Sequence, residues 1–184
     1  MHNGHIALAR SALKELCLNA VYFVPAKRSP LKTGARPVSA SHRVRMLKLA
    51  IAGEPGFRLS RAEIDRPAKT SYTIRTLGVF RKKFPGSDIF LLMGGDALAD
   101  LKKWKNWKKI LDICTVAAGA RKGAGKKISG DLKKKAVWLK KGLPDISSTQ
   151  IRVLIPSGRT LSGKVARKVA EYIENNRLYK NERQ

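Results

Sequence analysis

The chain begins with Met1-His2-Asn3-Gly4-His5, and a run of helical character follows from Ile6 to Leu16. Two histidines therefore flank a glycine at the point where we expect a helix to start. The first backbone N–H groups of a helix have no partner inside it, and imidazole nitrogens also form hydrogen bonds. The stretch predicts an anion site, suited to phosphate, at the head of the first helix.

A second stretch of this kind is Ile146-Ser147-Ser148-Thr149-Gln150-Ile151-Arg152. Three hydroxyl residues precede a helical pattern, and an arginine follows one turn later. Ser and Thr at such a position are usual helix caps, which is the plainer interpretation. Taken together with the histidines, they indicate two phosphate sites and hence a nucleotide ligand.

Between these stretches, apolar β-rich runs alternate with amphipathic ones. We expect strands at 20–24, 57–64, 88–93, 113–120 and 137–139. We expect helices at 6–16, at 42–51 with Ser41 as cap, from 71 onward, at 149–155 and through 165–173, and a Gly/Lys-rich surface loop up to about residue 131. This alternation predicts an α/β fold with a doubly wound, Rossmann-like parallel sheet and its ligand at the carboxyl ends of the strands. Without a repeat or a linker, residues 1–184 should form a single domain.

The two cysteines are far apart in sequence. Cys17 lies in a helical pattern and Cys114 in an apolar run, which predicts two buried free thiols in a reducing compartment. The sequence shows no zinc or redox motif, so we expect no protein-bound metal site. It also shows no leader pattern and no apolar run of membrane-spanning length. We therefore expect a cytoplasmic protein.

The charge of the chain is strongly positive: 39 Lys and Arg against 13 Asp and Glu give a net charge of +26. Such a balance concentrates polyanions, so ATP, pyrophosphate and nucleic acid are all compatible partners. The plainer interpretation is that the lysines form solvated helix faces and loops. Because no nucleic-acid-binding module is recognisable, we expect small nucleotides rather than nucleic acid, and no membrane, as partners.

Two further segments carry candidate ligand-binding residues. Asp96 follows an apolar strand and Gly94-Gly95, which suits binding of ribose hydroxyls, although Asp96 could equally cap the next helix. Trp104 and Trp107 are three residues apart and can share one face of a helix or turn. Core packing explains one of them, and stacking on a flat aromatic ligand would explain the other.

The histidine and Ser-Ser-Thr stretches resemble the His-x-Gly-His and Ile-Ser-Ser-Thr-x-Ile-Arg motifs of the nucleotidylyltransferase superfamily, and the resemblance covers nearly the whole chain. Further landmarks are similar to those of the bacterial nicotinate-nucleotide adenylyltransferase family: Phe23-Val24-Pro25 with Lys32, Glu63 ahead of Ser71-Tyr72-Thr73, Gly94-Gly95-Asp96, Trp104 with Trp107, and Tyr172-Ile173. Pantetheine-phosphate adenylyltransferases share the two motifs but not the Ser-Tyr-Thr or tryptophan pattern. Nicotinate mononucleotide is therefore the preferred acceptor.

The resemblance implies transfer of AMP from ATP to nicotinate mononucleotide in NAD biosynthesis, with release of pyrophosphate and with Mg²⁺ accompanying ATP. It implies catalytic roles for His2, His5 and Arg152, and ATP binding by these three with Asp96, Ser147, Ser148 and Thr149. It assigns the nicotinate nucleotide to Lys32, Thr73, Gly94, Trp104 and Arg121.

The sequence departs from the family pattern at two places. Arg121-Lys122-Gly123 stands where the family usually has Arg-Pro-Gly, and Met1 directly precedes the first histidine, where the family has a strand and a Gly-Gly-Ser/Thr-Phe-x-Pro segment. We therefore expect the first, central strand to be missing from this chain, which would leave a fragment of impaired stability and activity. The alternative hypothesis is a truncated relative of low activity that binds nucleotide or nucleic acid through its basic surface. The oligomeric state stays open, and a homo-oligomer is one possibility.

Overall fold

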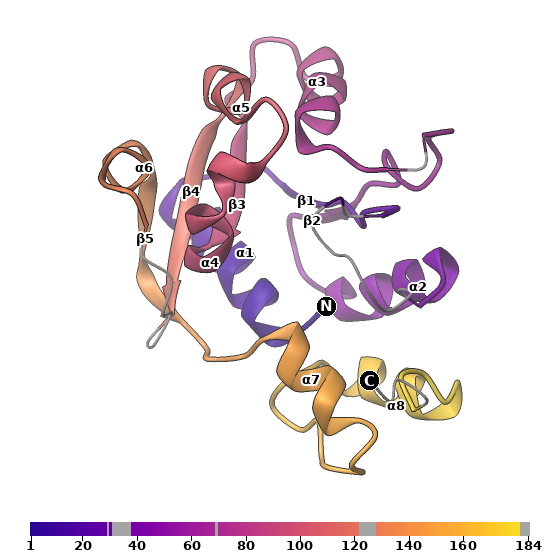
Figure 1. Ribbon diagram of the computed structural model, residues 1–184. Coiled ribbons are helices and arrows are strands. Elements are labelled where there is room, and N and C mark those ends of the chain that lie inside the picture. The colour runs from indigo at the N-terminus through magenta and orange to yellow at the C-terminus, as the bar shows by residue number, and fades with distance from the viewer. Residues whose placement is uncertain (29, 31–37, 69, 122–127, 181–184) are drawn as a thin grey trace.

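The computed structural model describes residues 1–28, 30, 38–68, 70–121 and 128–180; the side chain of Arg121 is outside this description. Within these ranges helices and parallel strands alternate along the chain (Figure 1). The strands are β1 (Val21–Phe23), β2 (Phe57–Leu59), β3 (Phe90–Gly94), β4 (Thr115–Arg121) and β5 (Val137–Leu143). The helices are α1 (Asn3–Glu15), α2 (Ala40–Ile51), α3 (Thr73–Lys83), α4 (Gly95–Ala99), the 3₁₀ helix η1 (Leu101–Lys103), α5 (Trp107–Ile113), α6 (Gly130–Lys135), α7 (Ser148–Leu154) and α8 (Arg167–Asn175). The predicted parallel α/β architecture is confirmed.

The strands form two parallel sheets. One has the order β1-β2 and the other the order β3-β4-β5, and in the described residues no strand joins β1 to β3. The registers pair Val21 with Phe57 in the first sheet and Phe90 with Thr115 in the second. Strand β3 and most of β4 are apolar, as expected of parallel strands covered on both faces, whereas the edge strand β5 contains Lys140 and Lys141 and is largely exposed.

Helix α1 connects the two sheets. Ile6 and Ala9 pack in the cluster that contains Val21 of β1, whereas Leu8 packs in a cluster with Leu139 of β5. Neighbouring positions of the helix thus reach different sheets, because residues of a helix point in different directions around its axis. Figure 1 shows α1 between β3 and α2, with the amino terminus beside α7. The packing of α1 on both sheets therefore fixes where its first turn lies relative to each of them.

Two larger apolar clusters form the core. The cluster around β1 and β2 includes side chains of α2, α7 and α8, among them Met46, Ile151 and Val169. The cluster on the three-stranded sheet is closed by α3, α4, η1 and α5, and it fully buries Leu98, Leu101 and Ile110. Both clusters place helix starts near the carboxyl ends of the strands, where ligands bind in folds of this class.

Several predicted boundaries differ from the structure. Helix α1 begins at Asn3 rather than at Ile6, so His5 lies inside the helix, and the cap of α2 is Ser39 rather than Ser41, because the Ser39 hydroxyl accepts from the His42 N–H at 3.3 Å. Strand β2 ends at Leu59, well before residue 64. Helix α6 was not predicted, since a run of lysines around the single buried Leu132 masks its periodicity. The other expected elements are present with ends shifted by a few residues, as is usual for helix and strand ends.

The two cysteines differ in environment. Cys114 is buried at the end of α5, and burial raises the pKa of its thiol to about 11. The prediction that Cys17 is buried is wrong. Because α1 ends at Glu15, Cys17 lies in the following turn with a φ of 49°, and its side chain is exposed.

Candidate active site

The first turn of α1 holds the two histidines in contact with one another. His2 is the N-cap residue, with extended φ and ψ of −140° and 167°, and its exposed fraction is 8%. Its ring centroid lies 3.8 Å from that of His5, which is exposed one turn later. The backbone N–H of His2 donates to Nδ1 of His5 over 3.4 Å. The structure therefore places both histidines at a helix start, with the His2 imidazole buried and the His5 side chain exposed.

Gly4 allows this turn to approach the second motif. A Cβ atom at position 4 would lie 3.0 Å from Nδ1 of His2 and 3.6 Å from the carbonyl oxygen of Ile146. Any larger side chain would therefore push the imidazole away or separate α1 from the segment that leads into α7. The absence of a Cβ at this position brings the two stretches that the sequence singled out into contact.

Asn3 connects the same turn to the chain beyond α7. Its backbone N–H donates to the carbonyl of Lys164 over 2.8 Å, and its side-chain amide donates to the carbonyl of Gly163 over 2.9 Å. These two bonds join residues about 160 positions apart. They hold the start of α1 against the segment between α7 and α8, close to the start of α7.

The start of α7 is a complete capping box. The Ser147 hydroxyl accepts from the Gln150 N–H at 3.1 Å, and the Ser147 N–H donates to the Gln150 side chain at 2.7 Å. Ser148 and Thr149 form the first turn, and the Arg152 guanidinium donates to the Thr149 hydroxyl at 3.3 Å. The capping interpretation therefore holds for Ser147. Ser148, Thr149 and Arg152 are the candidate phosphate ligands, and they lie together on one short helix.

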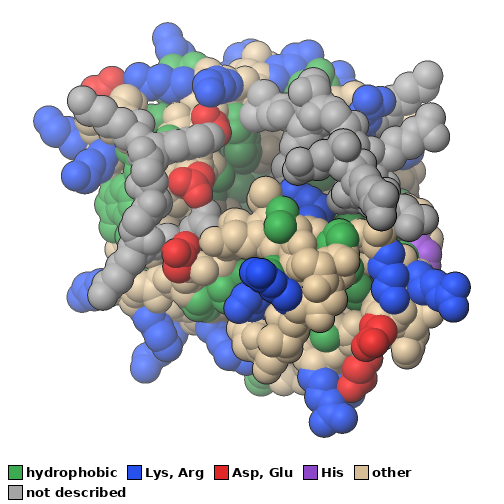
Figure 2. All heavy atoms as spheres, turned by 60° about the horizontal axis from the view of Figure 1, so that its bottom comes forward, with side chains coloured by type: hydrophobic (Ala, Val, Ile, Leu, Met, Phe, Trp, Pro, Cys, Tyr) green, Lys and Arg blue, Asp and Glu red, His purple; other side chains and the backbone are tan. Residues whose placement is uncertain are grey.

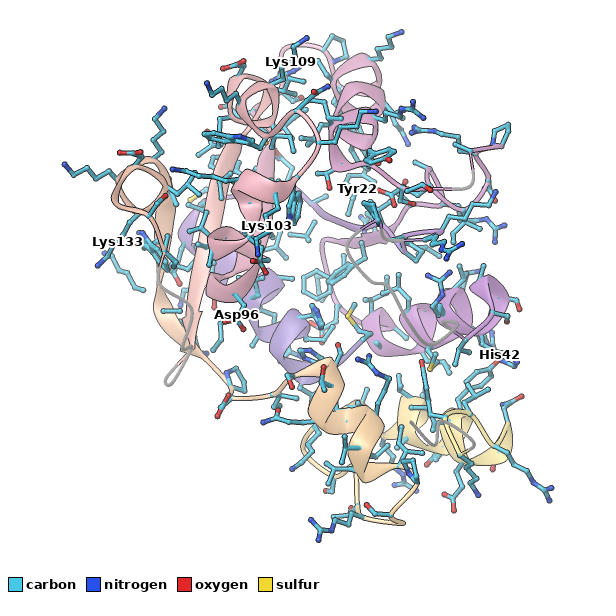
Figure 3. The ribbon with its side chains drawn as sticks, viewed as in Figure 1. Tyr22, His42, Asp96, Lys103, Lys109 and Lys133 are labelled. Atoms are coloured by element: carbon cyan, nitrogen blue, oxygen red, sulfur yellow. The ribbon has the colours of Figure 1, made fainter. Side chains whose placement is uncertain are left out.

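The Gly94-Gly95-Asp96 segment leads directly from β3 into α4. Gly94 is the last residue of the strand and the N-cap of the helix, and Asp96 lies in the first helical turn. The alternative that Asp96 itself caps the helix is therefore wrong. Figure 3 shows Asp96 on α4, from which the chain continues through η1 to Lys103. A carboxylate in the first turn of a helix at a strand end is suited to accept hydrogen bonds from sugar hydroxyls.

A cavity of about 540 Å³ brings together two residues predicted for the nicotinate side. Thr73, the first residue of α3, lies on one wall with Ser71 and Tyr72, and Trp104, just after η1, lies on another. Glu63 contributes the carboxylate of the lining, and the Thr76 hydroxyl donates to it over 2.6 Å. Both Trp104 and Trp107 pack against the apolar cluster of the three-stranded sheet, but only Trp104 is among the residues that line the cavity.

Sequence reasoning missed three members of this cavity, Tyr72, Lys103 and Lys105. Tyr72 directly precedes Thr73, and the two lysines directly flank Trp104. Their position next to predicted site residues was the feature of the sequence that could have indicated them. Gly94 does not appear in the cavity lining. Lys32 lies outside the described residues, and Arg121 ends β4 with a side chain that is not described.

A second cavity of similar volume lies between the segment after α7 and α8. Its lining includes Gly158, Leu161, Val165 and Ile173, and it contains none of the predicted site residues. Two groups of predicted site residues thus lie elsewhere. Thr73 and Trp104 line the first cavity, and the two histidines lie where the start of α1 approaches the segment that leads into α7.

Metal and membrane features are limited in the described part of the chain. Among those residues, no group of three or more His, Cys, Asp or Glu side chains could hold a metal ion. Within the same ranges, no helix has both the length and the apolar character needed to cross a bilayer.

The basic side chains are distributed over the surface rather than gathered in one stripe on the face that carries α7 and α8 (Figure 2). Among the described residues, the Arg61–Asp65 ion pair joins two exposed groups, and the Arg10–Glu54 ion pair joins an exposed guanidinium to a half-buried carboxylate. The Arg10 guanidinium beside Glu54 lowers the pKa of that carboxyl through a hydrogen bond. A surface of this kind raises the local concentration of any polyphosphate without selecting one.

The described residues form an α/β protein with parallel sheets, and comparison with known proteins specifies the family. The profile of the cytidylyltransferase-like family matches residues 1–154. A protein from Roseiflexus castenholzii, named "Probable nicotinate-nucleotide adenylyltransferase", is 36% identical over 186 residues, covering 98% of this chain and 92% of the relative. A protein of the same name from Thermus thermophilus is 38% identical over 180 residues, covering 98% and 94%.

Solved structures agree with the fold. The nicotinic acid mononucleotide adenylyltransferase of Plasmodium falciparum complexed with NaAD superposes with a TM-score of 0.77 at 15% identity, covering 97% of this chain and 91% of that one. The same enzyme complexed with APC gives a TM-score of 0.74 at 14% identity, with the same coverage. The chain therefore belongs to the cytidylyltransferase-like family and, within it, to the nicotinate-nucleotide adenylyltransferases.

Proposed function

We propose that this chain transfers AMP from ATP to nicotinate mononucleotide, giving nicotinate adenine dinucleotide and pyrophosphate in NAD biosynthesis. The observation that carries the proposal is the identity of 36% and 38% to two nicotinate-nucleotide adenylyltransferases over 98% of the chain. These relatives support this hypothesis rather than that of a truncated nucleic-acid-binding relative. In this proposal the two motifs bind the phosphates of ATP, and the Trp104 cavity binds the acceptor.

The reaction needs no protein nucleophile. A 5′-phosphate oxygen of the mononucleotide forms a bond to the α-phosphorus of ATP, and the bond from that phosphorus to the pyrophosphate oxygen breaks in line with it. Catalysis is then positioning of the two nucleotides together with stabilisation of charge on the transferred phosphoryl group. Both tasks fall to side chains that can donate hydrogen bonds to phosphate.

The histidine turn is suited to the phosphate at the reacting centre. Because Nδ1 of His5 accepts from the His2 N–H, the proton of neutral His5 resides on Nε2. Nε2–H can then donate to a phosphate oxygen, while the buried His2 fixes the turn from the other side. In this assignment His2 and His5 stabilise the charge that develops on the α-phosphate.

The α7 motif is suited to the leaving pyrophosphate. Arg152 and Thr149 are already in hydrogen-bonding contact, so one cation and one hydroxyl can bind neighbouring phosphate oxygens with Ser148 beside them. Asp96 would accept from the ribose hydroxyls. Mg²⁺ accompanying ATP would neutralise phosphate charge, since Mg²⁺ is commonly held by substrate phosphates and water with few protein ligands.

The acceptor is assigned to the Trp104 cavity. The indole ring can stack on the pyridine, and Thr73 at the start of α3 can present its backbone N–H to an anionic group. Lys32, Gly94 and Arg121 are assigned to the same nucleotide on the family resemblance alone. A reaction among free nucleotides also fits the cytoplasm as its location.

Purified chain with ATP, Mg²⁺ and either nicotinate or nicotinamide mononucleotide tests the proposal through pyrophosphate release. We expect turnover with both, and kcat/KM for the acid higher by at least about tenfold, which is about 1.4 kcal/mol. Addition of excess EDTA should stop the reaction. If neither acceptor led to pyrophosphate release, the proposal would be overturned.

A further inference from the structure

The Trp104 cavity contains two lysines whose surroundings differ. Lys103 and Lys105 stand on either side of Trp104, and all three line the cavity. Nζ of Lys103 donates to the Asp100 carboxylate at 2.9 Å, so its charge is compensated locally. Figure 3 shows Lys103 on this η1 segment, next to α4.

Lys105 has an aromatic neighbour instead of a carboxylate. Its Nζ lies 4.8 Å from the centroid of the ring of Tyr72, which also lines the cavity. Among the described residues, no carboxylate lies within ion-pairing distance of this ammonium group. A cation over an exposed aromatic face is held more weakly than a cation in a charge-assisted hydrogen bond. Lys105 can therefore leave the ring for an anionic ligand.

The backbone around Lys105 holds it in place. The Trp104 N–H donates to the Leu101 carbonyl at 2.9 Å, and the Trp107 N–H donates to the Trp104 carbonyl at 3.2 Å. Between them Asn106 adopts the left-handed conformation, with φ of 54° and ψ of 41°, which reverses the chain into α5. Lys105 is thus presented from a hydrogen-bonded turn directly beside the indole ring that would stack on the ligand.

The remaining charge in the lining disfavours an anion. Glu63 is the carboxylate of the described lining, and it is held by the Thr76 hydroxyl. A ligand carboxylate in this cavity needs a cation to offset that repulsion, and Lys103 is already paired with Asp100. A carboxamide needs no such cation, and a lysine ammonium, which only donates, can serve just its carbonyl oxygen.

We propose that Lys105 is the specificity-determining residue that selects a pyridine carboxylate over a pyridine carboxamide, by moving from the Tyr72 ring to the carboxylate. This inference rests on the proposed function and names the residue behind its acid preference. Because the carboxylate is remote from the reacting phosphate, Lys105 contributes to binding of the acceptor and not to the chemical step.

The test compares Lys105→Ala with Lys108→Ala. Lys108 is a matched control, since its Nζ also lies over an aromatic ring, Trp107 at 5.9 Å, but it does not line the cavity. Both variants remove one positive charge from the same segment, so a general effect of net charge would appear in both. Circular dichroism and the melting temperature establish that each variant is folded.

We expect Lys105→Ala to raise KM for nicotinate mononucleotide about tenfold, with kcat and the values for nicotinamide mononucleotide nearly unchanged. Lys105→Arg should retain most of the preference, Lys105→Glu should invert it, and Lys108→Ala should leave it within about twofold. An acid-to-amide ratio that is the same in wild type, Lys105→Ala and Lys105→Glu would overturn the inference.

Direct binding separates this inference from the proposed function. Quenching of tryptophan fluorescence, titrated with each mononucleotide in the absence of ATP, reports the preference without turnover. A wild-type chain that prefers the acid in binding, and loses that preference in Lys105→Ala, supports the inference even if no pyrophosphate forms. Binding of both mononucleotides with equal affinity by the wild type would overturn it, whatever the turnover.

Discussion

Gly119 of β4 offers a sharp test of how α1 is seated. A Cβ at this position would lie 2.5 Å from Cδ1 of Leu143, 2.9 Å from Cγ of Leu143 and 2.9 Å from Cδ1 of Leu8. Leu143 is half-buried and can rotate, but Leu8 is buried on α1, three residues after His5. Gly119→Ala must therefore displace either the end of β5 or the helix that carries the histidines.

The magnitude follows from two opposing terms. Overpacking a well-filled core costs about 1 to 3 kcal/mol, and replacing glycine within a strand returns roughly 0.5 to 1 kcal/mol of conformational entropy. We expect a net loss of about 0 to 2.5 kcal/mol in the free energy of unfolding, which for a domain of this size lowers Tm by up to about 10 °C. Turnover should fall as well, because α1 positions the histidine turn.

Urea unfolding and calorimetry measure the first effect, and pyrophosphate release measures the second. Gly142→Ala is the matched control: Gly142 lies on the neighbouring strand β5, and a Cβ there has no atom within 4 Å among the described neighbours. It should leave Tm unchanged or slightly raised. If Gly119→Ala were as stable and as active as Gly142→Ala, the packing of Leu8 on β4 described above would be refuted.

Four further predictions test other parts of the structure. Arg152→Ala should lower kcat by at least about tenfold with Tm within about 2 °C of wild type, because its contact to the leaving pyrophosphate strengthens as the bond breaks; unchanged turnover would reduce α7 to a plain capped helix. A thiol reagent at pH 8 should label one cysteine rapidly, Cys17, and Cys114 only after unfolding, since burial raises the pKa of Cys114 to about 11; rapid labelling of Cys17→Ser would contradict this. Glu54→Gln should cost less than about 1 kcal/mol at pH 7. Because Arg10 lowers the Glu54 pKa below its unfolded value of 4.5, the ion pair stabilises the fold above that pH and its contribution disappears as pH falls through the lowered pKa, so the two urea midpoints should converge in acid and a constant gap would refute the assignment. Finally, an engineered amino-terminal extension of about five apolar β-formers should raise Tm by pairing with the edges of β1 and β3 that no strand of the described residues occupies, whereas a matched Gly/Ser extension should not.

The sequence determined the features that arise from local chemistry. The apolar run at 88–93 predicted a parallel strand, which the structure has at Phe90–Gly94. The spacing of Val169 and Ile173 predicted the final amphipathic helix, because periodicity follows directly from backbone geometry. The histidine and Ser-Ser-Thr stretches were also visible as helix starts. Short motifs at helix starts can be recognised because cap chemistry involves only neighbouring residues.

Tertiary structure decided what distant residues do to one another. The close approach of Gly4 to the Ile146 carbonyl and the hydrogen bonds from Asn3 to Gly163 and Lys164 depend on how α1 lies against both sheets, which no local pattern encodes. The different surroundings of Lys103 and Lys105 are likewise a tertiary fact. Two lysines on either side of one tryptophan are equivalent in sequence. In the folded chain Asp100 lies beside Lys103 and compensates its charge, whereas Tyr72 lies beside Lys105 and leaves its charge available to a ligand.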